Sequence, residues 1–230
     1  MRSLSITTSL VFTGTMVGLL QFGSLSSYAQ NSNLEQCLET LHKTRQAINQ
    51  SRVPNQQALF PALDPTYQQH KQNYENWAEC VKGRKAPLTF VQTLDGKSYD
   101  VATFSGKILV INFWSTTCLP CIAEMPALNK LVKEYQENNV LFLGFAGDKA
   151  TRLTSAFFTK HPFDFEIIPE SQNMMSLFHT NTLPTTYIID QHGIIRKAWM
   201  GLDSNNEMDK LAPYYKAKSV IDDLLITSGK

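Results

Sequence analysis

Eight residues in the middle of the chain, 107–114 (KILVINFW), form a nearly continuous apolar run. A strand with one face in water alternates apolar and polar side chains, whereas a strand that is buried on both faces stays apolar along its length. A second run of the same kind occupies residues 140–146 (VLFLGFA). The two runs predict strands inside a sheet that has protein packed on both faces.

Shorter signals on either side give the order of the other elements. Two pairs of strand-like segments each surround turn residues, Asp95-Gly96 in the first pair and residues 191–193 in the second, so each pair predicts a hairpin. The hairpin strands are expected at 88–92 with 98–101 and at 185–190 with 194–199, helices at 118–137, 151–160, 171–179 and 216–226, and an extended segment at 163–168. The order β-α-β-α, then β-β-α, predicts an α/β fold with a mixed central sheet covered by helices on both faces.

The part of the chain before residue 87 has few strand signals. Apolar residues recur at helical spacing from Leu34 to Ile48 and again from Tyr67 to Val81, and a loop that contains three prolines separates the two stretches. We therefore predict a helical extension over residues 30–86, followed by the α/β domain over residues 87–230.

Residues 1–29 have the pattern of an export signal. Arg2 gives a weakly positive start, residues 10–22 are mostly apolar, and Ser27-Tyr28-Ala29 has the small-x-small form of a cleavage site. The apolar stretch is shorter than the roughly 20 residues of a transmembrane helix. The alternative is an uncleaved membrane anchor. We predict a periplasmic or otherwise extracytoplasmic protein after cleavage near Ala29.

The charges of the chain are balanced, with 21 Lys and Arg residues against 20 Asp and Glu residues. The sequence contains no long basic run and no basic segment interleaved with aromatic residues, which are the features that mark nucleic-acid binding. We expect no nucleic-acid partner.

The chain has four cysteines, an even number that suggests pairing in an exported protein. Cys37 and Cys80 fall on the two predicted helices of the extension. A disulfide between them would close a long loop and stabilise the fold by roughly 4 kcal/mol on the chain-entropy model. The alternative is two buried free thiols.

The other two cysteines, Cys118 and Cys121, follow a buried strand and begin a helix. Unpaired backbone N–H groups and the helix dipole stabilise a thiolate at that position, so Cys118 is the expected nucleophile. Cys121 lies one turn later, where it can attack a mixed disulfide formed by Cys118. Pro120 fits the first turn, whereas Pro126 falls in the helix interior and predicts a kink.

These residues carry a resemblance to a known family. WSTTCLPCIAEMP, residues 114–126, resembles the active-site segment of thioredoxin-fold proteins. Residues 83–121 and LPTTYIIDQHGIIRKAWMG, residues 183–201, resemble the opening hairpin, first core strand, cis-proline loop and closing hairpin of the exported TlpA/ResA/DsbE branch. The resemblance covers about residues 83–228 and implies a thioredoxin-like three-layer fold.

The resemblance also implies roles for individual residues. Pro184 is expected to be cis after Leu183 and to face the cysteine pair, so that the Leu183 backbone can pair with a substrate strand and Trp114 contributes to the same substrate-binding surface. Glu124 is expected near the sulfurs, where it can accept the proton of Cys121. One departure is Thr117, which stands where that branch usually has an aromatic residue before the first cysteine.

Other uses of a Cys-x-x-Cys pair are less well supported. Zinc needs two more ligands, and the five histidines are scattered without ligand spacing, so we predict no metal site and no cofactor. A purely structural bridge would close a very small loop and constrain little. A peroxidase of the thioredoxin fold would need a threonine at the position of Ser115.

Three functions follow from this pattern. The first is an exported thiol–disulfide oxidoreductase that mainly reduces oxidised proteins, in cytochrome c maturation among other settings, and that a membrane thiol electron donor re-reduces. The second is an oxidant or isomerase on the same fold. The third is a non-catalytic module that binds a partner through the extension. Because no histidine lies between the cysteines to stabilise the thiolate strongly, the sequence favours the reductase.

Overall fold

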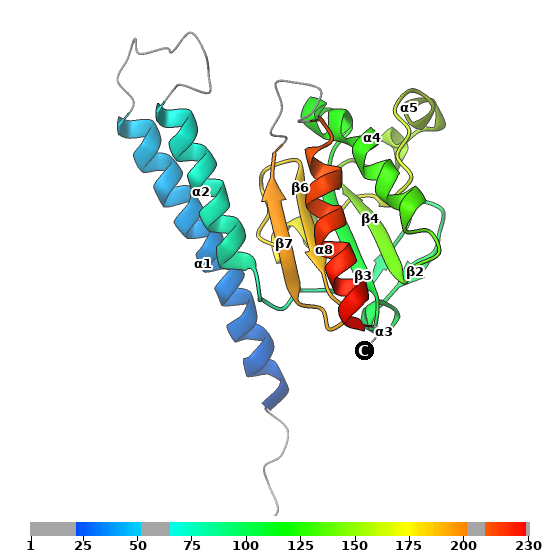
Figure 1. Cartoon of the computed structure of the whole chain (residues 1–230), viewed down its shortest axis with the longest axis horizontal. Helices are drawn as coiled ribbons and strands as arrows, with labels where there is room; N and C mark the ends of the chain where they lie inside the picture. Colours follow the sequence, from blue (N-terminus) through cyan, green and yellow to red (C-terminus); the bar gives the residue numbers. More distant parts are fainter. Residues whose placement is uncertain (1–21, 52–64, 202–209, 229–230) are drawn as a thin grey trace, which may run out of the picture.

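A computed structural model describes residues 22–51, 65–201 and 210–228 of the 230-residue chain. Its centre is a five-stranded sheet in the order β5-β4-β3-β6-β7 (Figure 1). These strands are β3 (Ile108–Trp114), β4 (Val140–Ala146), β5 (Glu166–Ile168), β6 (Thr185–Ile189) and β7 (Ile195–Met200). Strands β3, β4 and β5 are parallel, and β6 and β7 run antiparallel to their neighbours. The predicted mixed sheet is confirmed.

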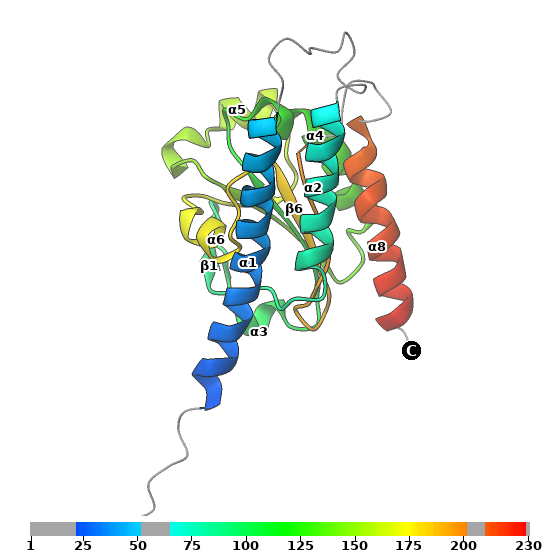
Figure 2. The same cartoon turned by 90° about the vertical axis from the view of Figure 1, so that its left-hand side faces the viewer.

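Strand β3 is central because it can be buried on both faces. All of its residues are buried. Its odd-numbered residues join a hydrophobic cluster with α1 (Phe22–Ser51) and α2 (Pro65–Val81). Its apolar even-numbered residues join a second cluster with α4 (Leu119–Glu134) and α8 (Ala212–Ser228). Figures 1 and 2 show the first helix pair and α8 on opposite sides of the sheet, which gives the predicted three layers.

The two N-terminal helices form an antiparallel pair against one face of the sheet (Figure 2). Cys37 of α1 is bonded to Cys80 of α2, with their Cα atoms 5.8 Å apart. The Trp77 ring meets the Tyr187 ring of β6 edge-on, with centroids 5.8 Å apart. This pair shares one hydrophobic cluster with the sheet, so packing does not mark a boundary between the two parts. The division between extension and domain near residue 86 stays a prediction.

The N-terminal signal is only partly within the described residues. Residues 1–21 lie outside them, and α1 begins at Phe22, before the cleavage site expected near Ala29. Among the described residues, no helix combines the length and the apolar character that a membrane crossing requires.

The short elements differ most from expectation. The first hairpin has strands of only two residues, β1 (Val91–Gln92) and β2 (Ser98–Tyr99), and α3 (Val101–Phe104) follows at once. The helix expected over 151–160 is divided into a 3₁₀ turn, η2 (Ala150–Arg152), and α5 (Ser155–Lys160). The helix expected over 171–179 is shorter, α6 (Gln172–Leu177).

Candidate active site

The cysteine pair lies at the point where β3 passes into α4. Cys118 is the N-cap of α4 with an extended backbone, and Cys121 is inside its first turn. The two are joined by a disulfide, with Cα atoms 5.2 Å apart, and the Cys121 N–H points at the Cys118 sulfur (3.2 Å). Cys118 is partly exposed, whereas Cys121 is buried. Of the two sulfurs, that of Cys118 is therefore the more accessible, and it lies at a helix N-terminus, a position that favours a thiolate.

Two prolines follow in α4, and each has a different local consequence. Pro120 lies in the first turn, where its missing N–H leaves no hydrogen bond unmade. Pro126 is inside the helix, and α4 nevertheless continues to Glu134. The structure thus keeps a single helix behind the cysteines.

The loop between Trp114 and Cys118 is held by Asp148, which follows β4. The Asp148 carboxylate accepts hydrogen bonds from the Thr116 N–H (2.6 Å) and from the Thr116 hydroxyl (2.9 Å). Arg152 lies 3.7 Å from the same carboxylate. No motif in the sequence pointed to Asp148. Its position just after a buried strand could have identified it as a candidate, because the carboxyl ends of parallel strands meet at one edge of a sheet and bring the residues that follow them together.

Glu124 is fully buried behind the cysteines, one helical turn after Cys121. One carboxyl oxygen accepts a hydrogen bond from the Asn112 side chain of β3 (2.7 Å), and the other has no partner among the described residues. The same Asn112 nitrogen also lies 3.0 Å from the Thr186 hydroxyl. Burial raises the pKa of Glu124 to about 8, so this group is mostly protonated at neutral pH.

The Leu183–Pro184 peptide is cis and lies beside the end of β3. Thr185, the next residue, is opposite Phe113 in the register of β6 and β3. Leu183 and Cys118 both pack against the cluster beneath α4 and α8. The structure therefore brings the proline loop and the cysteine pair to the same end of the sheet.

The expected contact between Trp114 and a substrate needs correction. The Trp114 side chain is fully buried, although it ends the strand that leads to the cysteines. Its ring packs among Phe157, Phe158 and Phe163, with centroid distances between 5.5 and 6.2 Å. Aromatic packing of this kind keeps the indole inside the core, so in this structure Trp114 supports the loop and presents no side-chain surface to a substrate.

The extension also reaches this end of the sheet. The Nε2 atom of His42 in α1 lies 2.8 Å from the side-chain amide nitrogen of Asn181, two residues before Leu183. Asn181 in turn accepts a hydrogen bond from Thr182 (3.4 Å). A helix that the resemblance did not cover therefore contacts the loop that carries the cis peptide.

Neither cysteine pair is available as a ligand in this structure, since both are disulfides. Within the described ranges, no group of three or more His, Cys, Asp or Glu side chains could hold a metal ion. The chemistry that the geometry supports is exchange of disulfide bonds.

Comparison with known proteins agrees with this geometry. The sequence model of the AhpC/TSA family matches residues 82–198, about half of the chain. The thioredoxin-like protein YneN of Bacillus subtilis is 32% identical over 131 residues, which cover 56% of this chain and 77% of that protein. The thiol-disulfide oxidoreductase ResA of Bacillus thuringiensis is 28% identical over 128 residues, which cover 55% of this chain and 74% of that protein.

A solved structure from Chlorobium tepidum, described as a thiol:disulfide interchange protein DsbE, has the same fold. It superposes with a TM-score of 0.51 and 22% identity, over 60% of this chain and 96% of that chain. At this level of identity the likeness concerns the fold alone. The family model, which matches residues 82–198, includes both cysteines of the candidate site and leaves out all of α1 and α2.

Proposed function

This chain belongs to the AhpC/TSA family and is a thiol–disulfide oxidoreductase of the thioredoxin fold, and on that premise we propose that it acts mainly as an exported reductase of protein disulfides. The observation that supports this proposal most directly is the Cys118–Cys121 disulfide at the start of α4, next to the cis Leu183–Pro184 peptide. A reachable sulfur, a buried second sulfur and a proline loop together suit the capture and release of a protein thiol.

The proposed reaction starts from the dithiol form. The Cys118 thiolate attacks one sulfur of the substrate disulfide, the substrate S–S bond breaks, and one substrate thiolate leaves and takes up a proton. The Cys121 thiol then loses its proton and attacks the Cys118 sulfur. The second substrate thiolate leaves, and the Cys118–Cys121 disulfide forms. Two electrons pass from the protein to the substrate, and the oxidised form is the one described here.

Glu124 is proposed to carry the proton of Cys121. Its pKa, raised by burial to about 8, lies close to that of an ordinary thiol, about 8.5. A proton therefore passes between the two groups at little cost in free energy. In the ionised form the carboxylate accepts the proton that Cys121 must lose.

Export is supported by the second disulfide. The Cys37–Cys80 bond joins two helices away from the cysteine pair of the candidate site, and a structural bond of this kind persists in an oxidising compartment. We propose that the chain works outside the cytoplasm, with its signal cleaved near Ala29. Oxidised haem-binding cysteines of apocytochrome c are one proposed substrate class, and a membrane thiol protein is the proposed source of electrons.

The test is reduction of insulin disulfides by the purified protein, together with its reduction potential. A potential well below about −200 mV supports the reductase, and a value near about −120 mV would instead indicate an oxidant. Cys118→Ser should abolish the activity, whereas Cys121→Ser should accumulate a mixed disulfide with the substrate. Turnover by the Cys118→Ser variant at the wild-type rate would refute the assignment.

A further inference from the structure

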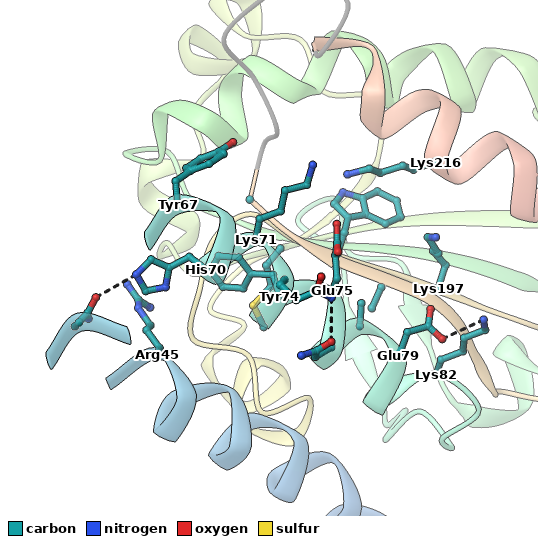
Figure 3. A pocket seen from close by; sticks show the side chains of 18 residues that line it. Arg45, Tyr67, His70, Lys71, Tyr74, Glu75, Glu79, Lys82, Lys197 and Lys216 are labelled. Atoms are coloured by element: carbon teal, nitrogen blue, oxygen red, sulfur yellow. Dashed lines mark hydrogen bonds and ion pairs between the residues drawn. The ribbon is translucent and has the colours of Figure 1, made fainter. Parts of the chain in front are cut away.

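A cavity of about 870 Å³ opens between the extension and the edge of the sheet. Its walls come from α1, α2, the upper part of β7 and the start of α8 (Figure 3). It is separate from the cysteine pair, because none of its lining residues belongs to the segment around Cys118. We call it the extension groove.

The lining of the extension groove is cationic, although the whole chain is balanced in charge. Among the described residues that line it, five are Lys or Arg and two are Glu. One carboxylate, that of Glu79, pairs with Lys82 at 3.4 Å, as Figure 3 shows. The other described charged residues of the lining, His70 aside, are Glu75 and four cations. The cations are Arg45, Lys71, Lys197 and Lys216.

Three of these cations lack an ion-pair partner in the described part of the chain: Arg45, Lys71 and Lys197. Arg45 and Lys71 are exposed, and Lys197 is half-buried. Figure 3 shows that these side chains reach the groove from three different elements, α1, α2 and β7. Positive charges placed on several walls of one groove favour an anionic ligand.

One end of the groove is hydrogen-bonded to the loop of the cis peptide. Gly201, which lines the groove, donates its N–H to the Pro184 carbonyl at 2.8 Å. From Gly201 the groove follows β7 back to Lys197. At roughly 3.3 Å per residue, that stretch of strand is ~13 Å long, which matches about four residues of an extended chain.

We propose that the extension groove binds an acidic, extended segment of the protein whose disulfide is exchanged. The inference rests on the proposed function, because the occupant is the chain next to the substrate cysteine. The Pro184 loop receives the residues at that cysteine, and the segment beyond them continues along β7. Its carboxylates lie against Lys71, Lys197 and Arg45. Arg45 and Lys71 lie on α1 and α2, which are both outside the family match, whereas Lys197 lies within it, so the extension supplies two of the three cations.

Binding is measured with two cysteine-free eight-residue peptides that carry a neutral rhodamine dye, one rich in Asp and Glu and one with Asn and Gln at those positions. Fluorescence anisotropy with the full chain should give a Kd about tenfold lower for the acidic peptide at low salt, and the difference should shrink at high salt. The double variant Lys71→Glu with Lys197→Glu should lose the preference, and the milder Lys71→Gln with Lys197→Gln should reduce it.

The matched control reverses two exposed lysines elsewhere, Lys133→Glu with Lys160→Glu, and should keep the preference. Equal affinity for the two peptides, or equal loss in the control, would overturn the proposal. So would displacement of the acidic peptide by inorganic phosphate at the same concentration, or stronger binding to anionic phospholipid vesicles, since either would assign the cations to another ligand.

A catalytic readout separates this proposal from the proposed function. The neutral reagent 2-hydroxyethyl disulfide has no segment to fill the groove, so its reduction reports the cysteines alone. If wild-type protein reduces this reagent and shows no preference for acidic peptides, the groove proposal fails and the reductase stands. If the acidic preference is present without any disulfide reduction, the reductase fails and the groove remains a peptide-binding site.

Discussion

The carboxyl group of Glu124 makes the stability of this fold depend on pH. Burial raises its pKa to about 8 from an unfolded value of 4.5, so the folded chain holds this proton more tightly than the unfolded chain does. The contribution of this proton to the free energy of unfolding is complete below pH 4.5 and is lost as the pH rises towards 8. Each pH unit within that window costs up to about 1.4 kcal/mol.

Glu124→Gln removes this titration and keeps an oxygen that can accept the hydrogen bond of Asn112. The variant should therefore be less sensitive to pH between about 5 and 8 and more stable than wild type near pH 8, as measured by urea unfolding at several pH values. Insulin reduction should fall by about 100-fold, because Cys121 loses the proton acceptor proposed for it. Glu137→Gln, at an exposed position beyond α4, is the control. Parallel pH profiles for wild type and Glu124→Gln would contradict the argument.

Asp148 is a second single residue on which the site depends. Asp148→Ala leaves the Thr116 N–H and hydroxyl without their acceptor, which should lower the free energy of unfolding by about 1–2 kcal/mol. The loop before Cys118 should also open more often, so amide exchange at Thr116 should accelerate and kcat/KM for insulin should fall. Asp164→Ala removes an exposed carboxylate and should change neither. An unaltered Thr116 exchange rate in the Asp148 variant would count against this role.

At the scale of elements, the contact between α1 and the cis-peptide loop is the least expected feature. His42 lies 2.8 Å from Asn181, although 139 positions separate them. A hydrogen bond contributes about 0.5–1.5 kcal/mol, which corresponds to a change of about 2- to 10-fold. His42→Ala should lower kcat/KM for insulin by that factor and leave reduction of 2-hydroxyethyl disulfide unchanged. His42→Gln, which keeps a hydrogen-bonding side chain, should restore most of the loss. Equal losses with both disulfides would show a general effect on the fold.

The long buried elements were predictable from sequence because their signal is local. The strand expected over 107–114 is β3 at Ile108–Trp114, and the strand expected over 140–146 is β4. The helix at Val101–Phe104 was missed because four residues carry no periodicity. Its start is set by the Asp100 side chain, which accepts the Thr103 N–H at 2.8 Å. Thr154 likewise starts α5 and divides the longer helix that was expected there.

The candidate site was predictable where its residues are neighbours along the chain. The spacing of Cys118 and Cys121 after a buried strand favours a redox pair, whereas the expectations for Glu124 and for the cis Pro184 came from the family resemblance. Asp148 and the pair of His42 and Asn181 depend on contacts between distant segments, and no periodicity or motif encodes such contacts. The cations of the extension groove are scattered in the same way, since they come from α1, α2, β7 and α8.

At the scale of the whole molecule, the extension and the sheet share one hydrophobic cluster. Leu34 and Leu41 of α1 and Trp77 of α2 are buried in the same cluster as Tyr187 of β6 and Met200 of β7. Removing the extension would uncover this apolar face, and large exposed apolar patches promote aggregation. The two parts should therefore unfold together in a single transition.

The Cys37–Cys80 disulfide provides a test of that coupling. The double variant Cys37→Ala with Cys80→Ala removes a cross-link between positions 43 apart, which contributes roughly 4 kcal/mol on the chain-entropy model. We expect the urea midpoint to fall while the unfolding curves from tryptophan fluorescence and circular dichroism still coincide, because the shared cluster joins both parts. Cys118 and Cys121 stay oxidised throughout, so the change reports the structural bond alone. Two separate transitions, with α1 and α2 lost first, would mean that this disulfide rather than apolar packing holds the extension against the sheet.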